Sequence, residues 1–306
     1  MPALGVGACG RYAIDTNELK YVYHENGQQF IKVLPTFSTL FSLGSVPQGK
    51  DLPGFRFDPR LLLHGQQHIE VFKPLPSNAT VITIHNKVSL AGLHDKGKAA
   101  YEEGSGELLS LNRLSAFLHG AGGFSDPSQP FTYRDYPANQ LSAIRVPESP
   151  PYAVFEDCTQ PSQACVLLFV QHCCIRLSGD YNPLHSDPMF AEVSGFPRPI
   201  LHGLCTLGFA VRAIIKRICR GDPDMVKTIS GRFLLHVYPG ETLVTEMWLQ
   251  DLRYYPSICV TLEVSDEGRS DVDAIFCRVI YRVKAKDRNL AVLSGFVHLH
   301  GLAASL

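Results

Sequence analysis

Three side chains with acid–base or hydrogen-bonding chemistry lie close together just past the middle of the chain. They are the carboxylate of Asp180, the amide of Asn182 and the imidazole of His185, in the stretch G-D-Y-N-P-L-H. The glycine and the proline favour an irregular loop over a regular strand. A carboxyl group titrates at about pH 4 and an imidazole at about pH 6.5, so one can hold a proton that the other lacks. The pattern is suited to an acid–base pair for proton transfer, with Asn182 able to orient a partner or a water. The simpler alternative is that Asp180, Asn182 and Asp187 are turn and cap residues and His185 is a loop histidine.

Two helices are expected after this loop. Asp187-Pro188 has the form of a helix start, a capping carboxylate followed by proline, and Gly195 has the form of a helix end. A second helix is expected with Gly203 in its first turn, because apolar residues then recur at helical spacing. They are Leu204, Leu207, Val211, Ile214, Ile215 and Ile218. The Gly203 N–H, at the positive end of this helix, is suited to stabilise an oxyanion.

The residues around both features resemble a known family. The pattern G-D-x-N-P-L-H, followed by G-F-x-x-P-I-L-H-G-L, is similar to that of the MaoC-like hydratases, and within them to the 2-enoyl-CoA hydratase 2 unit of peroxisomal multifunctional enzymes. Further stretches resemble the family in the same order along the chain: A-L-G-V-G-A at 3–8, L-H-G-Q-Q at 63–67, F-K-P-L-P at 72–76, D-K-G-K at 95–98, G-A-G-G-F at 120–124 and V-Y-P-G at 237–240. The chain departs from the family at Pro2 and Ile175, where tyrosine is usual.

The resemblance implies a hydro-lyase of fatty-acid β-oxidation. It would add water reversibly to trans-2-enoyl-CoA and give (3R)-hydroxyacyl-CoA. Asp180 and His185 would hold the reacting water, Asn182 would orient them, and the Gly203 N–H would stabilise the charge that develops on the thioester oxygen. Coenzyme A is then part of the substrate, and no metal or other cofactor is required.

Four more residues are candidates for substrate contacts, each with a simpler alternative. Arg198 can reach a CoA phosphate or only cover the surface. Lys96 and Lys98 can lie near phosphates or form a charged hairpin turn. His202 can contact the substrate or stand beside the start of the second helix.

Two halves joined by a linker are expected, over residues 1–145, 146–164 and 165–306. In the first half, 81–93 and 107–118 read as strands; after Ile229, so do 233–238, 241–252, 257–265 and 274–284. One long helix followed by antiparallel strands resembles the hot-dog fold. The expected fold class is therefore α+β, a double hot-dog in which each half is a long helix wrapped by a curved sheet. Only the second half carries G-D-x-N-P-L-H, so the first is expected to bind the acyl chain.

Composition excludes several other functions. The 306 residues are 45% hydrophobic with a net charge of −1, which gives no reason to expect nucleic acid or an anionic membrane as partner. No apolar run approaches the roughly 18 residues of a membrane span. The nine cysteines lack a repeated C-x-x-C spacing, which favours reduced thiols over disulfides or zinc. His64 and His68 have a metal-pair spacing, but no third ligand is near, so no metal site is expected.

Location, partners and two rival functions complete the expectations. The last three residues, Ala304-Ser305-Leu306, match the peroxisomal S-K-L signal only in part, because the basic residue is missing. With the resemblance they favour the peroxisome, with the cytosol as the alternative. The resemblance also implies a homodimer and a (3R)-hydroxyacyl-CoA dehydrogenase that works with this chain or was fused to it. An acyl-CoA thioesterase on the same fold and a non-catalytic acyl-CoA-binding module remain open.

Overall fold

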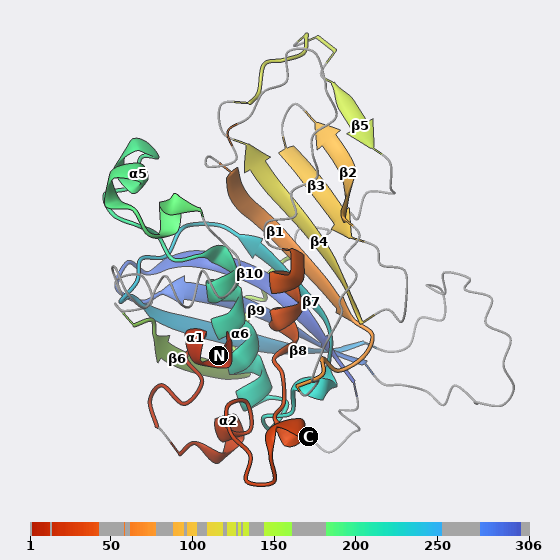
Figure 1. The fold of residues 1–306 in the computed structure, drawn as a ribbon, viewed down its shortest axis with the longest axis vertical. Helices are drawn as coiled ribbons and strands as arrows, with labels where there is room; N and C mark the ends of the chain where they lie inside the picture. The colour runs from red at the N-terminus through yellow and green to blue at the C-terminus, as the bar shows by residue number, and fades with distance from the viewer. Residues whose placement is uncertain are drawn as a thin grey trace, which may run out of the picture.

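A single antiparallel sheet dominates the computed structural model (Figure 1). The structure describes the chain except for residues 1, 13, 43–57, 59–61, 78–87, 95–96, 103–108, 119–120, 127, 130, 135–143, 161–181, 253–275 and 301–306. Within the described residues ten strands run in the order β5-β2-β3-β4-β1-β7-β10-β9-β8-β6. Their bounds are β1 Leu62–Val71, β2 Val88–His94, β3 Gly97–Glu102, β4 Ser110–Leu118, β5 Thr132–Arg134, β6 Ala153–Cys158, β7 Val226–Phe233, β8 Thr242–Leu252, β9 Phe276–Ala285 and β10 Leu290–Leu299.

The two halves of the sequence meet in the middle of this sheet. Strands β1–β5 come from the first half, and the other five come from the second part of the chain. The junction is the antiparallel pair of β1 and β7, in register from Gln66 opposite Arg232 to Glu70 opposite Thr228. Backbone hydrogen bonds therefore continue from one half into the other.

One long helix, α6 (Gly203–Arg217), packs on one face of the sheet. Its buried side chains Leu207, Val211 and Ile214 follow helical spacing and join the same core as Ile229 of β7 and Val297 of β10. Lys216 and Arg217 lie in its last turn, where cations favour the helix dipole. In the first half, the 3₁₀ helix η2 (Pro35–Ser42) lies beside α6 and also contacts β1 and β4.

The other described helices are short. They are α1 (Pro2–Gly5), α2 (Thr16–Leu19), η1 (Gln28–Phe30), η4 (Pro183–His185), α5 (Pro188–Val193) and η5 (Pro223–Met225). Helices α1 and α2 lie beside α6 in Figure 1, although they come from the N-terminal end of the chain. Among the described residues, no helix has the length and apolar character needed to cross a membrane.

The expected strands match the structure unevenly. β8 and β9 coincide closely with 241–252 and 274–284, whereas 257–265 falls outside the described residues. The prediction of a strand at 233–238 was wrong, because β7 ends at Phe233 and the next two leucines are 42% and 46% exposed. β6 lies inside the predicted linker 146–164, where it forms a sheet edge by pairing with β8.

Candidate active site

The loop with the G-D-Y-N-P-L-H motif forms a short, capped turn where it is described. Asn182 is the N-cap of η4, and its side-chain oxygen accepts a hydrogen bond from the Leu184 N–H at 3.0 Å. Pro183 occupies the first position, which needs no N–H donor. Leu184 is 2% exposed and anchors the turn in the protein. Asn182 therefore shapes the loop that carries His185.

The His185 ring is held by the backbone of a distant segment. It is 8% exposed, and Nδ1 lies 3.0 Å from the carbonyl oxygen of Ile200. Because a carbonyl can only accept, Nδ1 carries the proton and donates it. The neutral ring then has its lone pair on Nε2. Proton exchange with a substrate or a water would therefore take place at Nε2.

The chain that follows Ile200 leads directly into α6. The Leu201 N–H donates to the Val237 carbonyl at 2.7 Å, which fixes the approach to the helix. His202 is the N-cap, and its Nδ1 accepts a hydrogen bond from the Leu204 N–H at 3.0 Å. The rings of His202 and His185 have centroids 4.7 Å apart. The imidazole of the motif and the start of α6 are thus neighbours, as the sequence predicted.

Gly203, the first residue of α6, is packed closely against an aromatic ring. A Cβ at this position would lie 3.1 Å from Cε1 of Phe233, tighter than an ordinary contact. Phe233 in turn contacts His64, with ring centroids 4.7 Å apart. As the first helical residue, Gly203 has an N–H with no partner inside the helix, at the positive end of the helix dipole. This donor is suited to hold an oxyanion.

Arg198 lies on the surface and stacks on an aromatic ring. The side chain is exposed, and its guanidinium carbon is 4.7 Å from the centroid of Tyr238. Arg288 also lies over this ring at 5.6 Å and forms an ion pair with Glu241 at 2.5 Å. Burial, and secondarily Arg288, lowers the pKa of His236 beside them. The surface formed by Arg198, Tyr238 and Arg288 is thus cationic and aromatic, a chemistry that suits phosphates and planar groups.

The structure describes most of the predicted site residues, but not all. Asp180 and Lys96 lie outside the described residues. The backbone of Lys98 lies in β3, opposite Leu93 of β2 and Ala116 of β4. Among the others, Asn182, His185, His202 and Gly203 belong to one local arrangement, whereas Arg198 stacks on Tyr238.

Two contributors were missed by the sequence analysis. The Ile200 carbonyl orients His185, and a backbone oxygen leaves no signal in a residue type. Phe233 packs against Gly203, but β7 and α6 are brought together only by the fold. The P-I-L-H-G-L stretch was the sequence signal that could have indicated these contacts, because Ile200 contacts His185 and Gly203 contacts Phe233.

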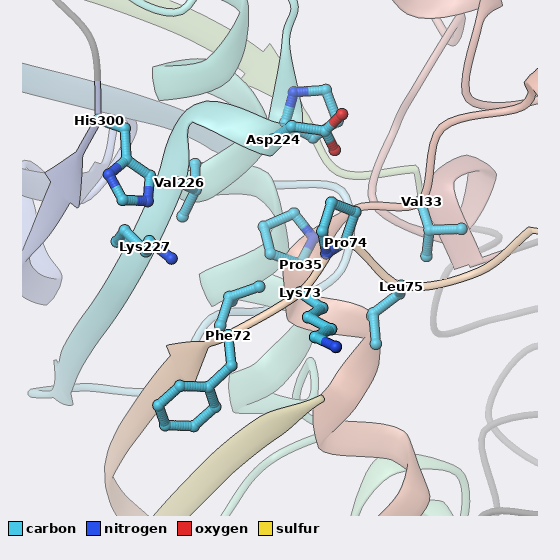
Figure 2. A pocket seen from close by; sticks show the side chains of 12 residues that line it. Val33, Pro35, Phe72, Lys73, Pro74, Leu75, Asp224, Val226, Lys227 and His300 are labelled. Atoms are coloured by element: carbon cyan, nitrogen blue, oxygen red, sulfur yellow. The ribbon is translucent and has the colours of Figure 1, made fainter. Parts of the chain in front are cut away.

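A separate pocket lies at the far ends of β1 and β7 (Figure 2). Val71 and Val226, the last residue of β1 and the first of β7, are in its wall. His64 and Phe233, which adjoin Gly203, lie toward the opposite ends of the same strands. Asp224 in the pocket forms an ion pair with Lys32.

In the described part of the chain, no group of three potential metal-ligating side chains occurs.

Comparisons with known proteins identify the family of the chain. A MaoC-like domain model matches residues 175–268, and a model of the MFE-2 hydratase 2 N-terminal domain matches residues 1–120. Peroxisomal enoyl-CoA hydratase 2 of Arabidopsis thaliana is 59% identical over 312 residues, covering 99% of this chain and 89% of that protein. Peroxisomal multifunctional enzyme type 2 of Mus musculus is 37% identical over 263 residues, covering 83% of this chain but only 33% of that protein.

A solved structure extends the likeness to the fold. The crystal structure of a MaoC-like dehydratase from Phytophthora capsici superimposes with a TM-score of 0.69 at 25% identity, covering 99% of this chain and 92% of that one. The expected α+β double hot-dog fold is thereby confirmed. With 59% identity across nearly its whole length, the chain belongs to the enoyl-CoA hydratase 2 family of MaoC-like hydratases and is a hydro-lyase.

Proposed function

We propose that this protein hydrates trans-2-enoyl-CoA to (3R)-hydroxyacyl-CoA, reversibly, as a step of fatty-acid β-oxidation. The observation that carries the proposal is the segment from Ile200 to Gly203. The carbonyl of Ile200 accepts a hydrogen bond from Nδ1 of His185. Gly203 is the first residue of α6, and its N–H is suited to stabilise an oxyanion. One short segment thus connects a candidate proton-transfer group with a candidate oxyanion donor.

Asp180 and His185 are proposed as the acid–base pair. Hydration places the oxygen of water on C3 and a proton on C2, so one water held between the two groups supplies both. One group takes a proton from this water, and the other delivers a proton to C2. His185 acts through Nε2, because its Nδ1 is engaged by Ile200. Acid–base groups of this kind contribute about 10²–10⁴ in rate.

The backbone N–H of Gly203 is proposed to receive the charge that develops on the thioester oxygen. Loss of one such donor costs about 10²–10³ in rate in other enzymes. Asn182 acts on the chemistry through the turn that it caps, by holding His185 in place. No metal or cofactor besides the CoA of the substrate is part of this proposal.

Arg198, Lys96 and Lys98 are proposed to contact the CoA part of the substrate. For Arg198 the support is its exposed position, stacked on Tyr238 next to the cationic Arg288. The first half of the chain, residues 1–145, is proposed to bind the acyl chain, because the motif occurs only in the second half.

A peroxisomal location, a homodimer and cooperation with a (3R)-hydroxyacyl-CoA dehydrogenase are also proposed. The relatives named above are peroxisomal by name, and one of them is a multifunctional enzyme about three times as long as the match. The C-terminal Ala304-Ser305-Leu306 adds partial support for the location.

The test is direct turnover of trans-2-decenoyl-CoA. We expect the absorbance of the conjugated enoyl thioester to fall on adding the protein, with chiral analysis giving the (3R) alcohol. Asp180→Asn and His185→Gln should each lower kcat by about 10² or more. Release of free thiol would instead indicate a thioesterase, and tight binding without loss of absorbance would indicate a binding module; either result would contradict the proposal.

A further inference from the structure

His202 adjoins both parts of the proposed site without belonging to the G-D-Y-N-P-L-H loop. Its ring is half-buried, and its centroid is 4.7 Å from that of His185. Its Nδ1 accepts the hydrogen bond of the Leu204 N–H, the second residue of α6. Its own backbone carbonyl accepts from the Cys205 N–H at 3.0 Å, which closes the first turn. His202 is therefore engaged with the helix start through both its side chain and its backbone.

The identity of the cap is unusual. Serine, threonine, aspartate and asparagine are the preferred N-cap residues, because a short side-chain oxygen reaches the free N–H groups of the first turn. Histidine can take this role only when Nδ1 is unprotonated, since a protonated nitrogen cannot accept. The contact between the Leu204 N–H and Nδ1 of His202 therefore makes this nitrogen the acceptor.

The capped N–H and the proposed oxyanion donor belong to consecutive residues. The direction of the Gly203 N–H depends on the peptide planes at the start of α6, and glycine lacks the side chain that would restrict them. On one side the chain is held by the hydrogen bond from Leu201 to Val237, at 2.7 Å. On the other side it is held by the His202 cap on Leu204.

From this geometry we propose that His202 is a positioning residue, whose Nδ1 caps α6 and thereby holds the Gly203 N–H in the direction that the reaction needs. The inference rests on the hydratase function proposed above. It assigns to His202 an action through the helix rather than through direct contact with the substrate.

Two substitutions at His202 distinguish the role of Nδ1 from that of Nε2. The side-chain oxygen of asparagine can occupy the place of Nδ1, and asparagine is among the best N-caps. The longer side chain of glutamine brings its polar atoms to the place of Nε2, beyond the reach of the cap. We expect His202→Asn to keep kcat within about threefold of the wild type, and His202→Gln to lower kcat about 10- to 100-fold with KM little changed, as for a misplaced catalytic group.

A second readout needs no turnover. Amide hydrogen exchange at Leu204 should be as slow in His202→Asn as in the wild type and faster in His202→Gln, because only the first retains the cap. Loss of activity in His202→Asn equal to that in His202→Gln would overturn the proposal, since it would assign the role to Nε2. Wild-type kcat in His202→Gln would overturn it as well. If the wild-type protein fails to hydrate enoyl-CoA, the function proposed above fails, while the exchange data still decide whether His202 is the cap.

Discussion

In the proposed mechanism, the backbone at Gly203 leaves room for a substrate carbonyl on one side, and on the other it packs against the ring of Phe233. We expect Gly203→Ala to lower kcat/KM about tenfold or more, because the added Cβ lies 3.1 Å from Phe233 and displaces either the ring or the substrate. The free energy of unfolding should change little, since alanine favours a helix by about 0.5–1 kcal/mol over glycine and so offsets the tight contact. Steady-state kinetics and urea unfolding measure the two effects.

A matched control distinguishes the two causes of this loss. In Gly203→Ala combined with Phe233→Leu, the ring that meets the new Cβ is absent. If kcat/KM of the double variant is still lower than that of Phe233→Leu alone, the added Cβ crowds the substrate. If kcat/KM of the two variants is equal, the displaced ring of Phe233 caused the loss. Unchanged kcat/KM in Gly203→Ala would contradict the placement of Gly203 at the reacting centre.

The roles of His185 and Gly203 remain predictions, based on the G-D-x-N-P-L-H and P-I-L-H-G-L stretches together. The structure adds contacts that residue types alone did not predict. The engagement of the Nδ1 atoms of His185 and His202 was not predicted, because one partner is a backbone carbonyl and the other a backbone N–H. Such contacts depend on the path of the chain, which residue types alone do not specify.

Among the elements, α6 carries the largest buried ionic contact of the described residues. Arg212 is 2% exposed and lies in the middle of the helix, where its guanidinium contacts the carboxylates of Glu18 and Asp157. Its Nε also donates to the carbonyl of Val6 at 2.7 Å. One side chain thus connects α6 with β6 and with two points of the N-terminal segment.

We expect Arg212→Met to reduce the free energy of unfolding by about 3–5 kcal/mol, because it leaves two carboxylates near the helix without their buried cation. Arg217→Met is the matched control, since Arg217 lies on the same helix with its side chain exposed. Urea unfolding of the two variants measures the difference. Equal stability of the two variants would show that the Arg212 contacts contribute nothing net to folding.

The elements that were predicted are those with local signals. Helix α5 has its proline start and its aspartate N-cap, whose Oδ1 accepts from the Met189 N–H at 2.9 Å, and α6 has its apolar period. β6 was missed because its six residues lie in a proline-rich stretch and become a strand only by pairing with β8. Arg212 was a neglected signal, since a charged residue between Val211 and Ala213 of an apolar helix requires distant partners.

Over the whole molecule, the two halves share more than a linker. β1 and β7 pair across the centre of the sheet, and the Tyr21 hydroxyl donates to the carbonyl of Gly221, just after α6, at 2.6 Å. The N-terminal segment therefore packs on the helix of the second half. The boundary at residue 145 remains a prediction. The contacts that stabilise the fold join residues on both sides of it. Stability of the shared sheet is consequently a property of the entire chain.

His298 gives this stability a pH dependence. The residue lies in β10, opposite Thr228 of β7 and Arg278 of β9. Burial lowers its pKa from 6.5 to about 4, and electrostatic interactions with Arg278 and His68 act in the same direction. The unfolded chain therefore binds a proton at this histidine more readily than the folded protein does. The contribution to stability is complete above about pH 6.5 and is lost as the pH falls toward 4.

We expect the free energy of unfolding to fall by about 2 kcal/mol from this residue between pH 7 and pH 4, since one pKa unit corresponds to about 1.4 kcal/mol and partial exposure reduces the full value. His298→Gln cannot take up the proton, so its stability should decline less steeply over the same range. Urea unfolding of both proteins at several pH values measures the two slopes. Because both histidine states are neutral above pH 7, the difference between the proteins should become constant there. Parallel curves between pH 7 and pH 4 would mean that His298 titrates alike in the folded and unfolded chain, and that the buried centre of the sheet does not exclude its charge.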